Sequence, residues 1–190
     1  MAYVWSPITG TVTSTNCYCD CLGGCPTPAD CQSSPCKHGA SSYWLGVWPG
    51  PEDIAAAQGT QVYFSASSSV QSIRFVHRRI CQTLPDTDTA THALEVQLYS
   101  QPNAGGNLLG KILYGHVTSR VPYDGEVRNI SSYSNNWDNM PSIGTLAPAA
   151  SQSWCSTGPH VHMECSSEFT RNGLCCGNNT SAKYTLIYSS

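Results

Sequence analysis

The sequence predicts a mainly β protein, built from antiparallel strands that are joined by long loops. Stretches with alternating apolar residues recur along the chain, and residues 70–80 and 91–100 are the clearest of them. No long 3.6-residue apolar period, which would indicate a helix, is found. The chain also has 11 cysteines, six of them within residues 17–36. Cysteines in this number and density indicate disulfides that staple the loops.

Length and charge narrow the functional classes. A chain of 190 residues suits one domain, here residues 1–190. Only 11% of the residues are charged and the net charge is -3, which argues against a nucleic-acid surface. No apolar stretch reaches the length of a membrane span, and no signal-peptide pattern opens the chain. The cysteine content then predicts the mature form of a secreted, extracellular protein.

The expected elements follow in order. Residues 3–14 predict an edge or bent strand, interrupted by Pro7 and Gly10. Residues 15–42 predict a cysteine-rich, disulfide-stapled insertion loop. Further strands are expected at residues 61–65, 70–80 and 183–188, and a hairpin at 91–116 that turns at 102–106. On that hairpin, the residues expected to share the apolar faces are Leu94, Val96 and Leu98, then Leu108, Ile112, Tyr114 and His116.

Residues 52–59 are ambiguous. Their local propensity predicts a short helix that begins after Pro51 and ends at Gly59.

The segment 155–165, Cys-Ser-Thr-Gly-Pro-His-Val-His-Met-Glu-Cys, carries the most distinctive chemistry. If it is a strand, His160 and His162 point to the same face, about 6–7 Å apart. That spacing suits a metal ligand beside a general base. Glu164 would follow on the same face, where it could orient an imidazole.

His116 has two interpretations. On the apolar face of its strand, a single histidine is commonly a hydrogen-bonded core residue. Alternatively, it completes a site with the pair at 160 and 162. His77 lies next to two arginines and His92 lies in a polar segment, so both are expected to be surface residues.

Several short motifs together resemble the lysostaphin-type zinc endopeptidases. They are Tyr-Gly-His-Val at 114–117, Asp-Gly at 124–125, Ile-Gly-Thr-Leu at 143–146 and Gly-Pro-His-Val-His-Met-Glu at 158–164. Residues 53–63 resemble the strand of this family that carries the metal-binding aspartate. The motifs occur in the family's order over residues 45–166, and His-x-His-x-Glu is the most specific of them. Within the family, the sequence looks closest to the secreted leukocyte cell-derived chemotaxin branch.

The resemblance implies a fold and a set of roles. The fold would be an antiparallel β-sandwich or open barrel of the lysostaphin type, in which the segment around Asp53 is a strand. Asp53 and His162 would be zinc ligands. His116 and His160 would flank the metal-bound water, one as general base and the other as stabiliser of the tetrahedral intermediate. Zinc lowers the pKa of its bound water, and an adjacent imidazole can remove the proton.

One family ligand is missing at its usual place. The family has a histidine four residues before the aspartate, but here that position is Pro49, or Trp44 if an insertion is allowed. Neither side chain ligates zinc. His38 is the nearest substitute, and it requires a large loop between two ligands. Without His38 the site keeps one carboxylate and one imidazole, too few for a tight catalytic zinc.

Three functional hypotheses remain. The first is a secreted pseudoenzyme whose zinc site is degenerate and whose former substrate groove binds a glycan, a peptide or an extracellular protein. The second is an active zinc endopeptidase that cleaves Gly- or Ala-containing cross-link peptides, with His38 as third ligand. The third is a self-assembling extracellular structural protein, because the odd number of cysteines allows a disulfide-linked homo-oligomer.

Overall fold

The computed structural model of the chain describes residues 3–5, 7–8, 10–15, 52–153, 155–166, 169–171 and 185–188. The cysteine-rich loop expected at residues 15–42 lies outside this part, apart from residue 15. His38, Trp44 and Pro49 also lie outside it.

The described residues form a mainly β structure with short 3-10 helices, as the sequence predicted. The strands are β1 (Tyr3–Trp5), β2 (Thr11–Thr15), β3 (Glu52–Ala55), β4 (Gln61–Val62), β5 (Ser72–Arg79), β6 (His92–Gln101), β7 (Gly105–Gly115), β8 (Val117–Ser119), β9 (Val127–Asn129), β10 (Gly144–Leu146), β11 (His160–Cys165), β12 (Phe169–Arg171) and β13 (Thr185–Tyr188). The 3-10 helices are η3 (Thr89–Thr91), η4 (Ile130–Tyr133) and η5 (Trp137–Asn139). No helix in these ranges has the length and apolar character needed to cross a membrane.

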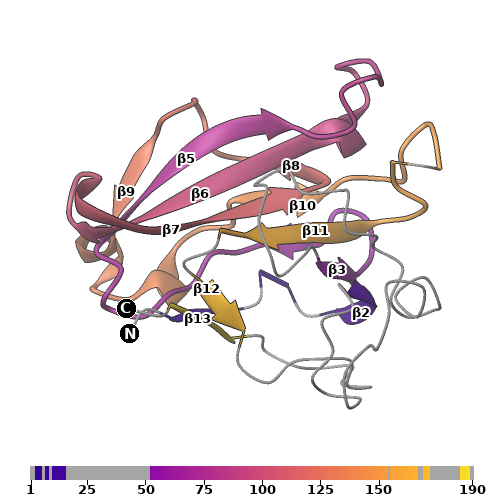
Figure 1. Ribbon diagram of the computed structural model, residues 1–190. Coiled ribbons are helices and arrows are strands. Elements are labelled where there is room, and N and C mark those ends of the chain that lie inside the picture. Colours follow the sequence, from indigo (N-terminus) through magenta and orange to yellow (C-terminus); the bar gives the residue numbers. More distant parts are fainter. Residues whose placement is uncertain are drawn as a thin grey trace, which may run out of the picture.

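One large sheet organises the fold (Figure 1). It has seven antiparallel strands in the order β2-β3-β11-β7-β6-β5-β9, and two three-stranded sheets accompany it, β4-β10-β8 and β1-β13-β12. Strand β11 therefore lies between β3, which precedes it by about a hundred residues, and β7. The sheet order brings together segments that are distant in sequence.

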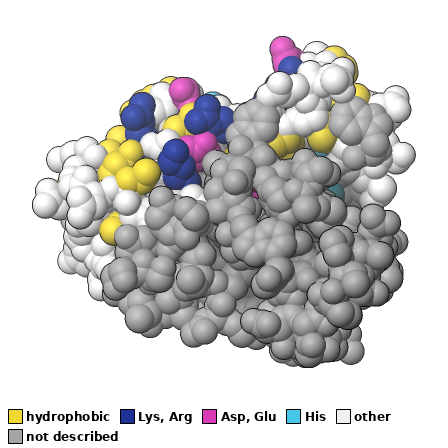
Figure 2. Space-filling model, in the orientation of Figure 1, with side chains coloured by type: hydrophobic (Ala, Val, Ile, Leu, Met, Phe, Trp, Pro, Cys, Tyr) yellow, Lys and Arg dark blue, Asp and Glu magenta, His cyan; other side chains and the backbone are white. Residues whose placement is uncertain are grey.

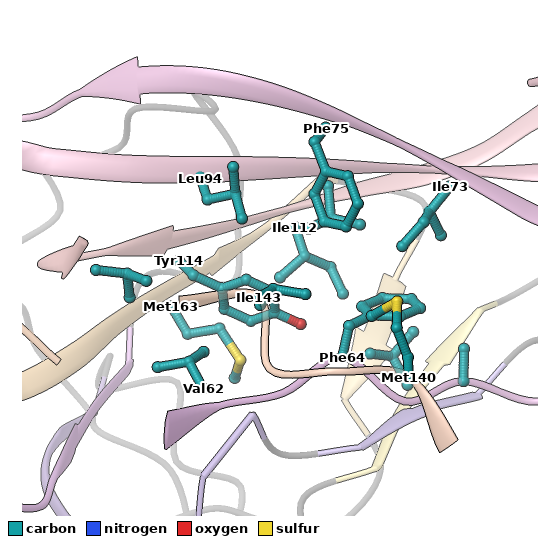
Figure 3. Packing of buried hydrophobic residues seen from close by; sticks show 14 of the residues in the cluster. Val62, Phe64, Ile73, Phe75, Leu94, Ile112, Tyr114, Met140, Ile143 and Met163 are labelled. Atoms are coloured by element: carbon teal, nitrogen blue, oxygen red, sulfur yellow. The ribbon is translucent and has the colours of Figure 1, made fainter. Parts of the chain in front are cut away.

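The hydrophobic core lies against one face of the large sheet. Phe75, Leu94 and Ile112 project from β5, β6 and β7 toward Val62 of β4 and toward Phe64 (Figure 3). All five side chains are at most 1% exposed. At about 25 cal/mol per Å² of buried apolar surface, this contact is the main driving force that fixes the register of the sheet.

The β6–β7 hairpin confirms the strongest prediction from the sequence. Leu94, Val96 and Leu98 are fully buried, as expected from their alternation. The prediction for Leu108 was wrong, because its side chain is 37% exposed. The register shifts between Leu98 and Tyr99, so one extra residue on β7 changes which side chains face the core.

The helix that local propensity predicts for residues 52–59 is also wrong. Residues 52–55 form β3, paired with β2 on one side and with β11 on the other. An eight-residue helix does not offset its nucleation cost by itself, whereas a central strand gains hydrogen bonds on both edges and buries Ile54 completely. Tertiary pairing has overridden the local preference.

Candidate functional site

Strand β11 separates an apolar face from a polar one by simple alternation. Val161 and Met163 are buried in the core. His160, His162 and Glu164 point to the opposite face of the large sheet, as the sequence predicted. The hydrogen bond of 2.9 Å between His162 Nε2 and Glu164 Oε1 confirms that these two side chains share this face.

Pairing with β3 places Asp53 beside the two histidines. Asp53 lies directly opposite His162 in the sheet register. Its Oδ1 is 3.1 Å from His162 Nδ1 and 3.5 Å from His160 Nε2. Residues more than a hundred positions apart in sequence thus form one polar cluster.

His162 is held between two carboxylates. Each of its ring nitrogens faces a carboxylate oxygen, Asp53 Oδ1 on one side and Glu164 Oε1 on the other. Burial by itself would lower the pKa of His162, but the hydrogen bonds and charges of Asp53 and Glu164 outweigh it and raise the pKa to about 9. At neutral pH the ring is therefore an imidazolium that donates both of its N–H groups.

His116 joins the cluster from the end of β7. Its backbone has a φ of 59°, in the left-handed region that non-glycine residues seldom adopt. Such strained positions concentrate at functional sites, because the surrounding structure must enforce them. The left-handed turn places its ring 4.5 Å from the ring of His160 and 6.0 Å from that of His162, between centroids. Of the two placements that the sequence left open for His116, the structure has the one beside the pair at 160 and 162.

The protonation of His116 is determined by its environment. Its Nδ1 lies 2.5 Å from the carbonyl oxygen of Ala90, which can only accept, so Nδ1 carries the proton. Burial, together with the charges of His160 and His162, lowers the pKa of His116 to about 3. The ring is therefore neutral and keeps a lone pair on Nε2.

His160 has a similar arrangement. Its Nδ1 lies 2.7 Å from the carbonyl oxygen of Gly158, so this nitrogen donates. Its Nε2 faces Asp53 Oδ1 at 3.5 Å. His116 Nε2 and the carboxylate of Asp53 thus place two acceptors in one small region, beside the ring of His160.

A small apolar cluster borders the site on the side of β7. It consists of Ile80, Ala93 and Leu113, with Cys81 packed against it. Gly115 makes this packing feasible, because a Cβ at this position would lie 2.7 Å from Ile80 Cδ1 and 3.2 Å from His162 Cβ. The absence of a side chain at Gly115 thus lets His162 and Ile80 lie close together.

The site is largely enclosed. The relative exposure is 3% for His116, 7% for His162 and 8% for Asp53. Among the coloured side chains of the face in Figure 2, small areas of histidine surface are visible. A disulfide between Cys81 and Cys155 ties the turn after β5 to the loop that leads into β11.

The described residues do not by themselves fit a zinc ion. Asp53 and His162 lie together as the resemblance implies, and Glu164 stands behind His162 as an orienting carboxylate would. However, in the described ranges no group of three or more His, Cys, Asp or Glu side chains is arranged to hold a metal ion. The third ligand considered from the sequence, His38, is outside those ranges.

The sequence predicted the side chains of the polar cluster but not the backbone groups that orient them. The structure brings together four predicted side chains, Asp53, His116, His160 and His162. His77 lies elsewhere, hydrogen-bonded to Ser119 Oγ, and so does His92, hydrogen-bonded to the carbonyl oxygen of Asp86. The carbonyl of Ala90 that orients His116 could not be predicted, because every residue has a backbone carbonyl and the sequence does not indicate which one will accept.

The comparison of this chain with models of protein families, with curated proteins and with solved structures gives no match.

Proposed function

We propose that this chain is a secreted, lysostaphin-like binding domain whose zinc site is degenerate. It acts as a pseudoenzyme, and the polar cluster around His160 forms part of the groove that binds a peptide, a glycan or an extracellular protein. The sequence motifs at residues 114–117 and 158–164 support the family, and the antiparallel sheets are compatible with its fold.

The observation that carries the proposal is the state of His162. Both of its ring nitrogens are engaged by carboxylates, and the resulting imidazolium supplies the positive charge between Asp53 and Glu164. A zinc ligand needs a lone pair on the nitrogen that faces the metal. With Pro49 or Trp44 at the usual position of the third ligand, the internal cation is the simpler way to neutralise these two acids.

The ligand chemistry follows from the acceptors. One acceptor is the unprotonated Nε2 of His116, whose Nδ1 donates to the carbonyl oxygen of Ala90. The other is the carboxylate of Asp53, which lies beside His160 and His162. Such a surface binds hydrogen-bond donors, and both peptide N–H groups and sugar hydroxyls are donors.

Calorimetric titration with pentaglycine, tetra-alanine and a chitin oligosaccharide tests this function. We expect at least one of them to bind without a change in its mass, and we expect His160→Gln to weaken that binding tenfold or more. The matched control is His77→Gln, which changes an exposed histidine outside the cluster and leaves the affinity unchanged. Cleavage of a peptide, or the absence of binding to all three probes, would contradict the proposal.

An active zinc endopeptidase is the second candidate. It is favoured by the approach of Asp53 to His162, because the two atoms 3.1 Å apart could both reach one metal ion. In this case His38 supplies the third ligand, and added zinc produces peptide cleavage that is lost in His38→Ala.

A further inference from the structure

A carboxylate outside the polar cluster contacts both segments that orient its histidines. Asp88 lies in the loop between β5 and β6, directly before the 3-10 helix η3. Its Oδ1 accepts a hydrogen bond of 3.1 Å from the backbone N–H of Ala90. Its Oδ2 accepts bonds of 2.8 Å from the backbone N–H of Ser151 and 2.6 Å from the Ser151 hydroxyl.

The first of these contacts leads to His116. By capping η3, Asp88 holds the turn in which the carbonyl oxygen of Ala90 points at His116 Nδ1. A side-chain cap of this kind stabilises the turn that it begins. The orientation and tautomer of the His116 ring therefore depend on a turn that Asp88 maintains.

The second contact leads to His160. Ser151 belongs to the loop that precedes β11, and β11 begins with His160. The backbone N–H of Ala150 donates to the carbonyl oxygen of Ser156, and the Ser156 hydroxyl donates to the carbonyl oxygen of Gly158. That same carbonyl orients His160 Nδ1. A chain of contacts thus runs from Asp88 through this loop to His160.

We propose that Asp88 is a positioning residue that sets the relative placement of the His116 and His160 rings. One oxygen of its carboxylate fixes the support of His116, and the other fixes the loop that supports His160. The Cys81–Cys155 disulfide joins the same two segments at a different point, so Asp88 adjusts an arrangement that the disulfide already keeps together. The inference rests on the proposed function only in assigning these two rings to the binding site.

Nitrogen NMR of the histidine side chains tests the inference without any ligand, so the result is independent of the binding experiment. In the oxidised wild-type protein, His116 should show a protonated Nδ1 and an unprotonated Nε2. In Asp88→Ala we expect both His116 signals to move toward the average of the two tautomers, and the His160 signals to shift as well. His77, which lies outside both contact chains, should not change.

Two further variants separate the two oxygens. Asp88→Asn keeps one acceptor for the Ala90 N–H but replaces the other oxygen with an amide group that cannot accept from Ser151. It should shift His160 while His116 keeps its tautomer. Asp88→Asn also serves if Asp88→Ala does not fold. Asp86→Asn removes the same charge from the same loop, at a side chain paired with Arg79, and should leave both histidines as in the wild type.

Two outcomes would overturn the inference. One is a folded Asp88→Ala protein whose His116 and His160 signals coincide with those of the wild type. The other is an Asp86→Asn protein in which these signals move as far as in Asp88→Ala.

Discussion

At the scale of single residues, the site is defined by how each imidazole is protonated. His162 is cationic between Asp53 and Glu164, and His116 is neutral against the carbonyl of Ala90. The two rings lie only 6.0 Å apart, yet their pKa values are moved in opposite directions, to about 9 and about 3. For His162 the two carboxylates outweigh burial, whereas for His116 burial and the charges of His160 and His162 outweigh the hydrogen bond to Ala90.

The pKa of His162 predicts how stability depends on alkaline pH. A folded pKa of about 9 lies above the ordinary value of 6.5, so the contribution is complete below pH 6.5 and is lost as pH rises through 9. Each unit is worth about 1.4 kcal/mol, so the total is a few kcal/mol at most. Urea unfolding in EDTA should show this decline in the wild type but not in His162→Gln. His77→Gln should retain it, and an identical slope in His162→Gln would count against the imidazolium.

The pKa of His116 predicts the opposite dependence on the acid side. Because it is depressed from 6.5 to about 3, protonation favours the unfolded chain, and stability falls as pH decreases from 6.5 toward 3. His116→Asn, which tolerates the left-handed backbone, should lose less stability over this pH range than the wild type does. Equal losses in the two proteins, measured by urea unfolding, would contradict the assignment of a neutral, buried His116.

The backbone of His116 gives a separate prediction. At ordinary positions alanine is more stable than glycine by about 0.4–1 kcal/mol, because it restricts the unfolded chain. At a φ of 59° the order should reverse, because a Cβ in the left-handed region costs about 1–2 kcal/mol. The free energy of unfolding should therefore be higher for His116→Gly than for His116→Ala. A higher free energy of unfolding for His116→Ala than for His116→Gly would contradict this prediction. It would mean that the backbone leaves the left-handed region once the imidazole is removed.

At the residue scale, the sequence was enough to predict which side chains of residues 160–164 share a face. The alternation of His160, His162 and Glu164 required only that the segment be a strand. The protonation states could not be predicted, because they depend on backbone carbonyls and on pairing with β3.

At the scale of elements, the packing of Ile80, which follows β5, against β7 depends on Gly115. An alanine there would bring its Cβ to 2.7 Å from Ile80 Cδ1, so Gly115→Ala should destabilise the protein by about 1–3 kcal/mol. Ile80→Val deletes this Cδ1, and the double variant should recover part of the loss. Chemical denaturation measures both.

Gly158→Ala is the matched control for this experiment. Gly158 lies in the loop before β11, the strand that pairs with β7, and a Cβ there meets nothing within 4 Å. We expect its stability to stay within about 0.5 kcal/mol of the wild type. If Gly115→Ala and Gly158→Ala behave alike, the close approach between Gly115 and Ile80 has no energetic consequence.

Strands with strong alternation were predictable from sequence, and short or irregular ones were not. The β6–β7 hairpin follows from its apolar pattern and its turn. Strand β3 has no such pattern, and its residues favour a helix locally, so only pairing with β2 and β11 determines it. Leu108 was misplaced because a single extra residue in a strand reverses the faces beyond it.

At the scale of the whole molecule, the large sheet gathers the site from separate parts of the chain. Asp53, His116 and the pair at 160 and 162 come from strands or strand ends that the order β3-β11-β7 makes neighbours. The mainly β class was predictable, but this strand order and the pairing of Cys81 with Cys155 were not, since 11 cysteines allow many pairings.

The central claim is that this site works without a resident metal, with His162 as its internal cation. Elemental analysis of the purified full chain for zinc tests it most directly, after dialysis against buffer with micromolar zinc and then against buffer without it. The account predicts far less than one zinc per chain, unchanged in His162→Ala and in His38→Ala. One zinc per chain that disappears in either variant would contradict it and would favour the endopeptidase instead.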